Sequence, residues 1–143
     1  MSLGNVGYVA WAVLALVSYS LFTPLVKIAT RSAPSHVVAL VTNAVLVLAA
    51  LAVTVVTGDD VTAALDPETL PYVLGGGVFL AVGILSYYRA LAAGPVSVVV
   101  PVFGSFIAVS SLLGVVALGE TLTARKLLGV TLATVGVYLA ATG

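Results

Sequence analysis

The sequence predicts an all-α integral membrane protein, a bundle of five transmembrane helices. Hydrophobic residues make up 62% of the 143 residues and charged residues only 7%, whereas a soluble domain carries about 25% charged residues. Five basic and five acidic side chains cannot cover the surface of a chain of this length. The chain is therefore expected to bury its outer surface in lipid as one transmembrane domain, residues 1–143.

Four breaks divide the sequence into apolar runs of membrane-spanning length. A helix rises 1.5 Å per residue, so about 20 apolar residues cross the roughly 30 Å hydrocarbon core. The breaks read TRSAPSH, TGDDVTAALDPETLP, AAGPVS and GETLTARK. The expected helices cover about 6–29, 37–56, 72–91, 98–118 and 127–142. The last run is short, and four spans with a re-entrant or interfacial piece is the alternative.

Prolines account for three of the breaks. Pro34, Pro71 and Pro95 lack the N–H that a helix interior needs and suit a first helical turn. The second break is the longest and is expected to carry a short surface helix that starts near Asp66. It holds four of the five acidic residues, Asp59, Asp60, Asp66 and Glu68.

Several kinds of function are excluded by composition. The net charge is zero, which gives no reason to expect a nucleic-acid partner. Without cysteine there is neither a disulfide framework nor a thiolate site, and His36 has no neighbouring acid or histidine to complete a metal site. No nucleophile with a histidine and an acid, and no glycine loop followed by lysine, is present. We therefore expect no enzymatic activity, cofactor or metal. The first apolar run is too long for a signal peptide and is expected to remain as a helix.

The distribution of basic residues does not predict the orientation of the chain in the membrane. Orientation follows lysine and arginine in short loops. With five spans, Lys27, Arg31 and Arg89 belong to one side, and Arg125 and Lys126 to the other. Either local effects fix one orientation, or the chain inserts both ways and two copies pair antiparallel, which would place a solute site at the bilayer midplane.

Polar residues at membrane depth are the candidate site, because a polar group in lipid is costly unless it faces protein or water. Ser18 and Tyr19 lie near the middle of the first helix, and Trp11 lies on an adjoining stripe. An interfacial aromatic belt is the alternative for Trp11. Asn43 in the second helix makes either an interhelical hydrogen bond or a solute contact.

The fourth and fifth helices carry small residues and a proline. Pro101 frees a backbone carbonyl, so it is expected either to bend the fourth helix beside a cavity or to form a static kink. Ser105 lies on the same stripe. Small residues on one face of the last helix, including Gly129 and Gly136, indicate close helix packing rather than a ligand site.

The order of these features resembles an EamA-type repeat of the drug/metabolite transporter superfamily. The first helix ends with a lysine and is followed by a proline. The third helix ends in an aromatic residue followed by the pair AL, and the fourth helix carries a proline. After the fourth helix come the residues LGE and a threonine, and the last helix is rich in glycine. These features are Lys27, Pro34, Tyr88, Ala90, Leu91, Pro101, 118–121, Gly129 and Gly136.

The resemblance implies a five-helix repeat that moves metabolites or drugs by alternating access. Most relatives carry two such repeats in inverted orientation, so a single repeat implies a homodimer, here of dual topology. Two departures are present. Thr42 and Asn43 occupy the early part of the second helix, where the family often has an arginine. Residues 6–29 lack the membrane-embedded glutamate of the small multidrug-resistance relatives, which argues against proton-coupled export of cationic drugs by their mechanism.

The expected function is therefore transport of a small metabolite or amphipathic solute across the cell (plasma) membrane, with the lipid bilayer, the solute and a second copy of the chain as partners. Flipping of a lipid-linked sugar and a non-transporting subunit that regulates a partner are the alternatives. The residues expected to bind the solute are Trp11, Ser18, Tyr19, Asn43, Tyr88, Pro101 and Ser105.

Overall fold

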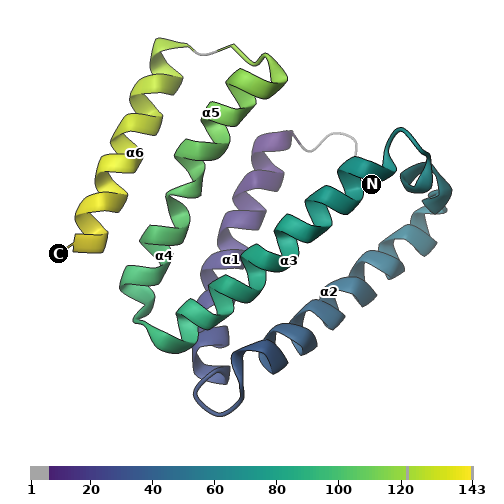
Figure 1. The fold of residues 1–143 in the computed structure, drawn as a ribbon, viewed down its shortest axis with the longest axis horizontal. Helices are drawn as coiled ribbons and strands as arrows, with labels where there is room; N and C mark the ends of the chain where they lie inside the picture. The colour runs from purple at the N-terminus through teal and green to yellow at the C-terminus, as the bar shows by residue number, and fades with distance from the viewer. Residues whose placement is uncertain (1–6, 122, 143) are drawn as a thin grey trace. The chain divides into compact units, whose positions relative to one another are not determined.

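The computed structural model describes residues 7–121 and 123–142, and every regular element within them is a helix (Figure 1). In chain order the helices are α1 (Tyr8–Ala29), α2 (Ser35–Thr57), the 3₁₀ helix η2 (Val61–Leu65), α3 (Leu70–Ala93), α4 (Val96–Gly104), α5 (Phe106–Leu118) and α6 (Ala124–Thr142). Five stretches are long and apolar enough to cross a bilayer: α1, α2, α3, α4 together with α5, and α6. The predicted all-α architecture with five candidate spans is confirmed.

Contacts between helices divide the chain into two units. Unit 1 ends at Ala92 and contains α1, α2, η2 and nearly all of α3; unit 2 begins at Ala93 and contains α4, α5 and α6. Within unit 2, α6 packs against both α4 and α5. A single transmembrane domain over 1–143 stays a prediction.

The helix ends follow the proline and glycine positions. Pro34 and Pro95 are the N-caps of α2 and α4, where the missing N–H of proline costs no hydrogen bond. Gly58 and Gly119 follow α2 and α5 with φ of 71° and 68°, the left-handed conformation that glycine adopts without steric cost and that ends many helices.

The expected helix over 98–118 is divided at Ser105. Pro101 lies inside α4 and has no N–H to offer the preceding turn. Four residues later, the Ser105 N–H is shared between the carbonyls of Pro101 (3.1 Å) and Val102 (3.3 Å), a tightened turn that separates α4 from α5.

The short helix of the longest connection lies before Asp66 rather than starting near it. Asp60 is the N-cap of η2, and its carboxylate accepts the backbone N–H of Thr62 at 2.8 Å. This bond holds the pKa of the Asp60 carboxyl below its usual value, since it favours the ionised form. The expectation of a helix starting near Asp66 was wrong because the capping carboxylate lies earlier in the chain.

The core of unit 1 lies at one end of its helices. Its buried residues come from the last two turns of α1, the first turns of α2 and the last two turns of α3. They are Thr23, Val26, Val38, Ala39, Tyr87, Tyr88 and Leu91. Among the described residues of unit 1, none outside these turns is buried. The three helices therefore bury side chains against one another at one end and leave them exposed towards the other.

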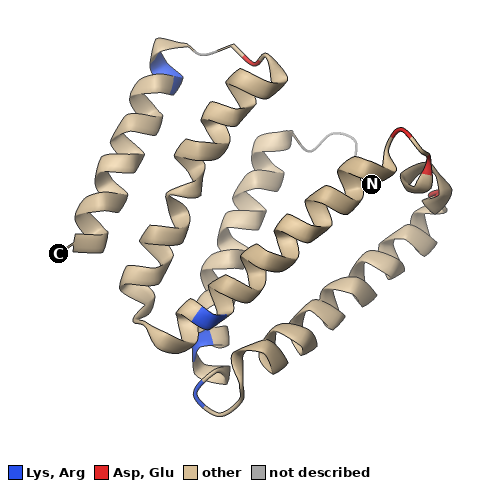
Figure 2. Ribbon diagram, viewed as in Figure 1, with Lys and Arg blue, Asp and Glu red and all other residues tan. Residues whose placement is uncertain are grey.

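Charge separates along the same axis (Figure 2). Unit 1 carries its basic residues where α1 and α3 finish, which we term the basic end, and its acidic residues in the connection between α2 and α3, termed the acidic end. The basic end carries Lys27, Arg31 and Arg89, and the acidic end Asp59, Asp60, Asp66 and Glu68. The packed core of unit 1 lies at the basic end.

Lys27 joins α1 to α3 at the basic end. Its ammonium donates to the backbone carbonyl of Leu91 at 2.6 Å, with the Ala92 carbonyl at 3.5 Å. The last carbonyls of a helix lack partners within the helix and carry partial negative charge. The Lys27 ammonium from the neighbouring helix supplies a hydrogen-bond donor to these carbonyls and a positive charge that offsets their partial negative charge.

We predict that Lys27→Met destabilises the protein by about 1–3 kcal/mol, the range for a hydrogen bond to a charged group. Arg31→Met, at the same end in an exposed position, is the matched control and should cost less than about 0.5 kcal/mol. Unfolding in detergent micelles measures both. Equal losses for the two variants would contradict this role of Lys27.

Candidate functional site

Two hollows lie among the helices of unit 1. The first, termed the tyrosine hollow, has a volume of about 310 Å³ and lies between α1, α2 and α3. The second, termed the α2–α3 hollow, has a volume of about 370 Å³ and lies between those two helices. Volumes of this size are at the lower end of those that hold small molecules.

The tyrosine hollow lies next to the packed core, on the side of the acidic end. Ser18 and Tyr19 are halfway along α1, and Asn43 is about 12 Å from the start of α2 at 1.5 Å per residue. The lining residues are Ser18, Tyr19, Phe22, Thr42, Asn43, Val45, Leu46, Ala49, Leu80, Ile84 and Tyr88. None of them is charged.

Two hydroxyl pairs lie at the end of the tyrosine hollow nearer the basic end. The Tyr88 hydroxyl forms a short hydrogen bond with Thr42 of α2, and the Tyr87 hydroxyl lies 3.0 Å from Thr23 Oγ1 of α1. Tyr88 is 1% exposed and Tyr87 5%. Adjacent residues on a helix point about 100° apart, so α3 bonds both neighbouring helices from a single turn. Tyr88 and Thr42 form the floor of the hollow.

Three aromatic rings form a continuous wall from α1 to α3. The ring of Phe22 lies edge-on to Tyr19, with centroids 5.7 Å apart, and edge-on to Tyr88, with centroids 5.8 Å apart. Edge-to-face pairs of this spacing are favourable because the positive ring edge meets the negative ring face. This wall offers flat apolar surface beside the hydroxyl groups of the floor.

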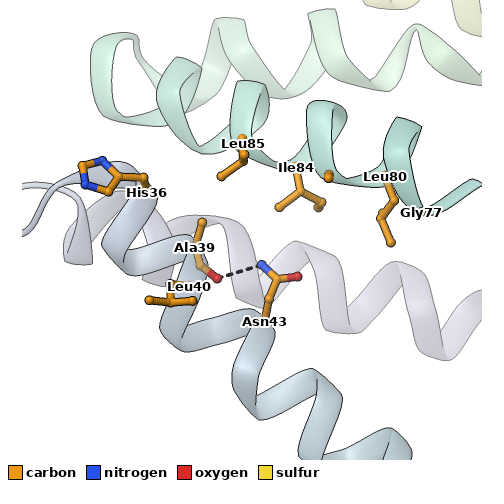
Figure 3. A pocket seen from close by; sticks show the side chains of 9 residues that line it. His36, Ala39, Leu40, Asn43, Gly77, Leu80, Ile84 and Leu85 are labelled. Atoms are coloured by element: carbon orange, nitrogen blue, oxygen red, sulfur yellow. Dashed lines mark hydrogen bonds between the residues drawn. The ribbon is translucent and has the colours of Figure 1, made fainter. Parts of the chain in front are cut away.

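Asn43 borders both hollows. Its amide nitrogen donates to the Ala39 carbonyl at 2.8 Å within α2 (Figure 3). An amide has two donor hydrogens and an acceptor oxygen, and this is the one hydrogen bond that Asn43 makes to the described residues. Of the two predictions for Asn43, an interhelical bond does not form in the part of the chain described. A second hydrogen and the oxygen remain for water or a solute.

The α2–α3 hollow is more apolar. Figure 3 shows side chains of α2 and α3 facing one another across it. Its lining residues are His36, Ala39, Leu40, Asn43, Gly77, Leu80, Ala81, Ile84 and Leu85. Asn43, Leu80 and Ile84 border the tyrosine hollow as well, so the two hollows share one wall.

Four of the seven residues expected to bind a solute line the tyrosine hollow: Ser18, Tyr19, Asn43 and Tyr88. Ser18 uses its proton on the Leu14 carbonyl, at 2.8 Å, in its own helix. Trp11 lies in the first turn of α1 and borders neither hollow, so its role, in a site or in an interfacial belt, stays a prediction.

The other two expected residues belong to unit 2. Pro101 lies inside α4 and Ser105 caps it, and both are half-buried. The Ser105 hydroxyl donates to the Val102 carbonyl at 2.6 Å. A solute contact for either residue stays a prediction.

Thr42 and Phe22 of the tyrosine hollow, and Tyr87 beside it, are not among the residues predicted from the sequence. Thr42 and Tyr88 lie 46 residues apart in the sequence, and Thr23 and Tyr87 lie 64 apart. A hydroxyl at helical spacing can bond its own backbone, as Thr42 does to Val38 at 2.9 Å. No local pattern distinguishes such a hydroxyl from one that also bonds a second helix.

The described residues offer no group of three or more histidine, aspartate or glutamate side chains that could hold a metal ion. The polar groups of the tyrosine hollow are hydroxyls and one amide. This arrangement can bind an uncharged polar group next to an apolar body, but it cannot compensate the desolvation of a strongly charged one.

A family model described as the EamA-like transporter family matches residues 6–142. The match covers nearly the whole chain and includes every residue of both hollows. No curated protein and no solved structure matches the chain.

If the tyrosine hollow holds water, a cysteine in its wall reacts with a water-soluble maleimide. The chain has no cysteine of its own, so single variants suffice. Ala49→Cys lines the hollow, and Val47→Cys, 64% exposed on another face of α2, is the control.

In liposomes we expect Ala49→Cys to react at least about tenfold faster than Val47→Cys. Hydrocarbon around a thiol raises its pKa, and each unit of that rise removes about nine tenths of the reactive thiolate. Equal rates at the two positions would show that the hollow is dry.

Proposed function

The chain belongs to the EamA-like transporter family, and from this premise we propose that it carries a small metabolite or amphipathic solute across the plasma membrane by alternating access. The observation that supports this most directly is the tyrosine hollow. It lies halfway along α1, is lined by hydroxyls, an amide and aromatic rings, and has the Tyr88–Thr42 pair at the end nearer the basic residues.

Alternating access requires a site that opens to one side at a time. In unit 1 the buried residues lie at the basic end and the helices pack loosely towards the acidic end. This asymmetry fits a state in which the basic end is closed. Rearrangement of the hydrogen bonds at the floor then opens the opposite state.

The working unit in this proposal is an antiparallel homodimer of dual topology. By helix count, the basic residues divide three to two, with Lys27, Arg31 and Arg89 on one side and Arg125 and Lys126 on the other. Orientation depends on such a bias, so both orientations are accessible. Two inverted copies then form one site between them near the bilayer midplane, which can open to either side of the membrane.

Facilitated diffusion is sufficient for the energetics. α1, described over Tyr8–Ala29, contains no acidic residue, and no charged residue lines the tyrosine hollow. A solute that moves down its gradient needs no coupled ion.

Flipping of a lipid-linked sugar is a second candidate, and the α2–α3 hollow favours it. That hollow is apolar and continues into the wall of the tyrosine hollow through Leu80 and Ile84. Such a path suits a molecule with an acyl tail in the lipid and a polar head at Asn43. Scrambling of a fluorescent lipid-linked sugar between leaflets, without flux of soluble metabolites, would select this candidate.

The first test is uptake by liposomes that contain the purified chain alone, with radiolabelled uncharged and zwitterionic metabolites as probes. We expect saturable uptake above that of empty liposomes. Asn43→Leu should lower kcat/KM by about tenfold, the effect of losing one hydrogen bond of about 1–1.5 kcal/mol. Val47→Leu is the control. Wild-type uptake no faster than in empty liposomes, for every probe, would instead support a non-transporting subunit that regulates a partner.

The second test fixes the orientation. Ser32→Lys with Ala93→Lys adds charge on one side, and Ala63→Lys with Thr121→Lys adds charge on the other; all four positions are exposed. We expect each double variant alone to lose most uptake and their co-expression to restore it. Reporters fused to the C-terminus measure orientation, and wild-type signal from one side only would reject dual topology.

A further inference from the structure

We infer that Tyr88 is a solute-operated gate, and that the solutes which operate it are uncharged molecules with a flat apolar body and a hydroxyl-type group that both donates and accepts a hydrogen bond. This inference rests on the proposed function, because it names the solute class and the trigger of the same hollow. It distinguishes Tyr88 from its neighbour Tyr87 by what surrounds each hydroxyl.

The two tyrosines differ in what surrounds their hydroxyls. Tyr88 and its partner Thr42 both line the tyrosine hollow. Tyr87 and its partner Thr23 are both buried, and neither lines the tyrosine hollow or the α2–α3 hollow. A solute that enters the hollow therefore reaches the Tyr88 pair and not the Tyr87 pair.

Counting protons assigns the donor in the floor pair. Thr42 has one hydroxyl proton, and its hydroxyl lies within hydrogen-bonding distance of the Val38 carbonyl (2.9 Å) and the Ala39 carbonyl (3.2 Å), which can only accept. Tyr88 is then the donor to Thr42 Oγ1, and the lone pairs of the Tyr88 oxygen remain available as acceptors. A solute hydroxyl can accept the Tyr88 proton in place of Thr42 and donate its own proton to a second acceptor, such as the amide oxygen of Asn43 in the same hollow.

The walls decide which solutes can do this. No charged side chain lines the hollow, so an ionic group would lose its hydration without compensation. The rings of Tyr19, Phe22 and Tyr88 form an edge-to-face series that offers apolar surface to a flat molecule. Asn43 supplies the remaining polar edge.

Loss of the Tyr88–Thr42 bond affects one helix pair. α1 remains tied to α3 through Thr23–Tyr87 and through Lys27 and the Leu91 carbonyl, so α1 and α3 stay together. α2 is tied to α3 at the floor by the Thr42–Tyr88 pair. The first turns of α2 are therefore the part that moves when a solute takes the place of Thr42.

Hydrogen exchange in nanodiscs tests the gate with two probes of similar shape: phenol, which carries the hydroxyl, and toluene, which lacks it. The readout is deuterium uptake by peptides that cover residues 36–44 of α2. In the wild type we expect phenol to raise the exchange rate about fivefold, since opening then costs one hydrogen bond less. Toluene should leave it unchanged.

Conservative variants separate the two tyrosines. Tyr88→Phe and Thr42→Val each remove the floor bond, so each should raise basal exchange at residues 36–44 about fivefold and abolish the response to phenol. Tyr87→Phe removes one hydroxyl of the same kind one residue away and should retain the response. Tyr72→Phe, 81% exposed, controls for loss of a tyrosine hydroxyl at the surface.

The gate is rejected if Tyr87→Phe and Tyr88→Phe behave alike, or if toluene raises exchange as much as phenol does. These outcomes are independent of the liposome assay. Exchange as expected without solute uptake would leave a solute-operated hollow in a protein that does not transport. Uptake without the phenol response would leave a transporter gated elsewhere.

Discussion

A polar group inside hydrocarbon must find its partner within the protein, and this constraint shapes unit 1. Most of its threonine and serine hydroxyls turn back to a carbonyl of their own helix, as Ser18 does to Leu14. A phenol is too long to do so, which makes Tyr87 and Tyr88 bond neighbouring helices instead. Together with Lys27 on the Leu91 carbonyl, they hold three apolar helices together where lipid provides little hydrophobic drive for association.

These bonds lie at one end, and the proposed function depends on that position. Towards the acidic end the helices are not held in the same way, which leaves the tyrosine hollow beside the floor pair. The outer faces remain apolar, as a chain in lipid requires. A bundle whose closed end combines a small core with a few rearrangeable hydrogen bonds suits the proposed carrier.

The sequence predicted the helices far better than the site. Apolar length and proline positions determine where helices begin, and Pro34 and Pro95 cap α2 and α4 as such residues should. Ser18, Tyr19 and Asn43 were accessible to prediction because polar residues at membrane depth are rare. The Thr42–Tyr88 pair was not, because it depends on how α2 and α3 cross, and nothing in either local sequence encodes a partner 46 residues away.

Distances between spin labels at the two ends of unit 1 test the central claim most directly. One double variant, Ala29→Cys with Ala92→Cys, places the labels at the basic end of α1 and α3. A second, Tyr8→Cys with Tyr72→Cys, places them at the acidic end. With labelled chains diluted in unlabelled ones in lipid, pulsed electron resonance should give one narrow distance at the basic end and a broad distribution at the acidic end. Equally narrow distributions at both ends would contradict a bundle held at one end only.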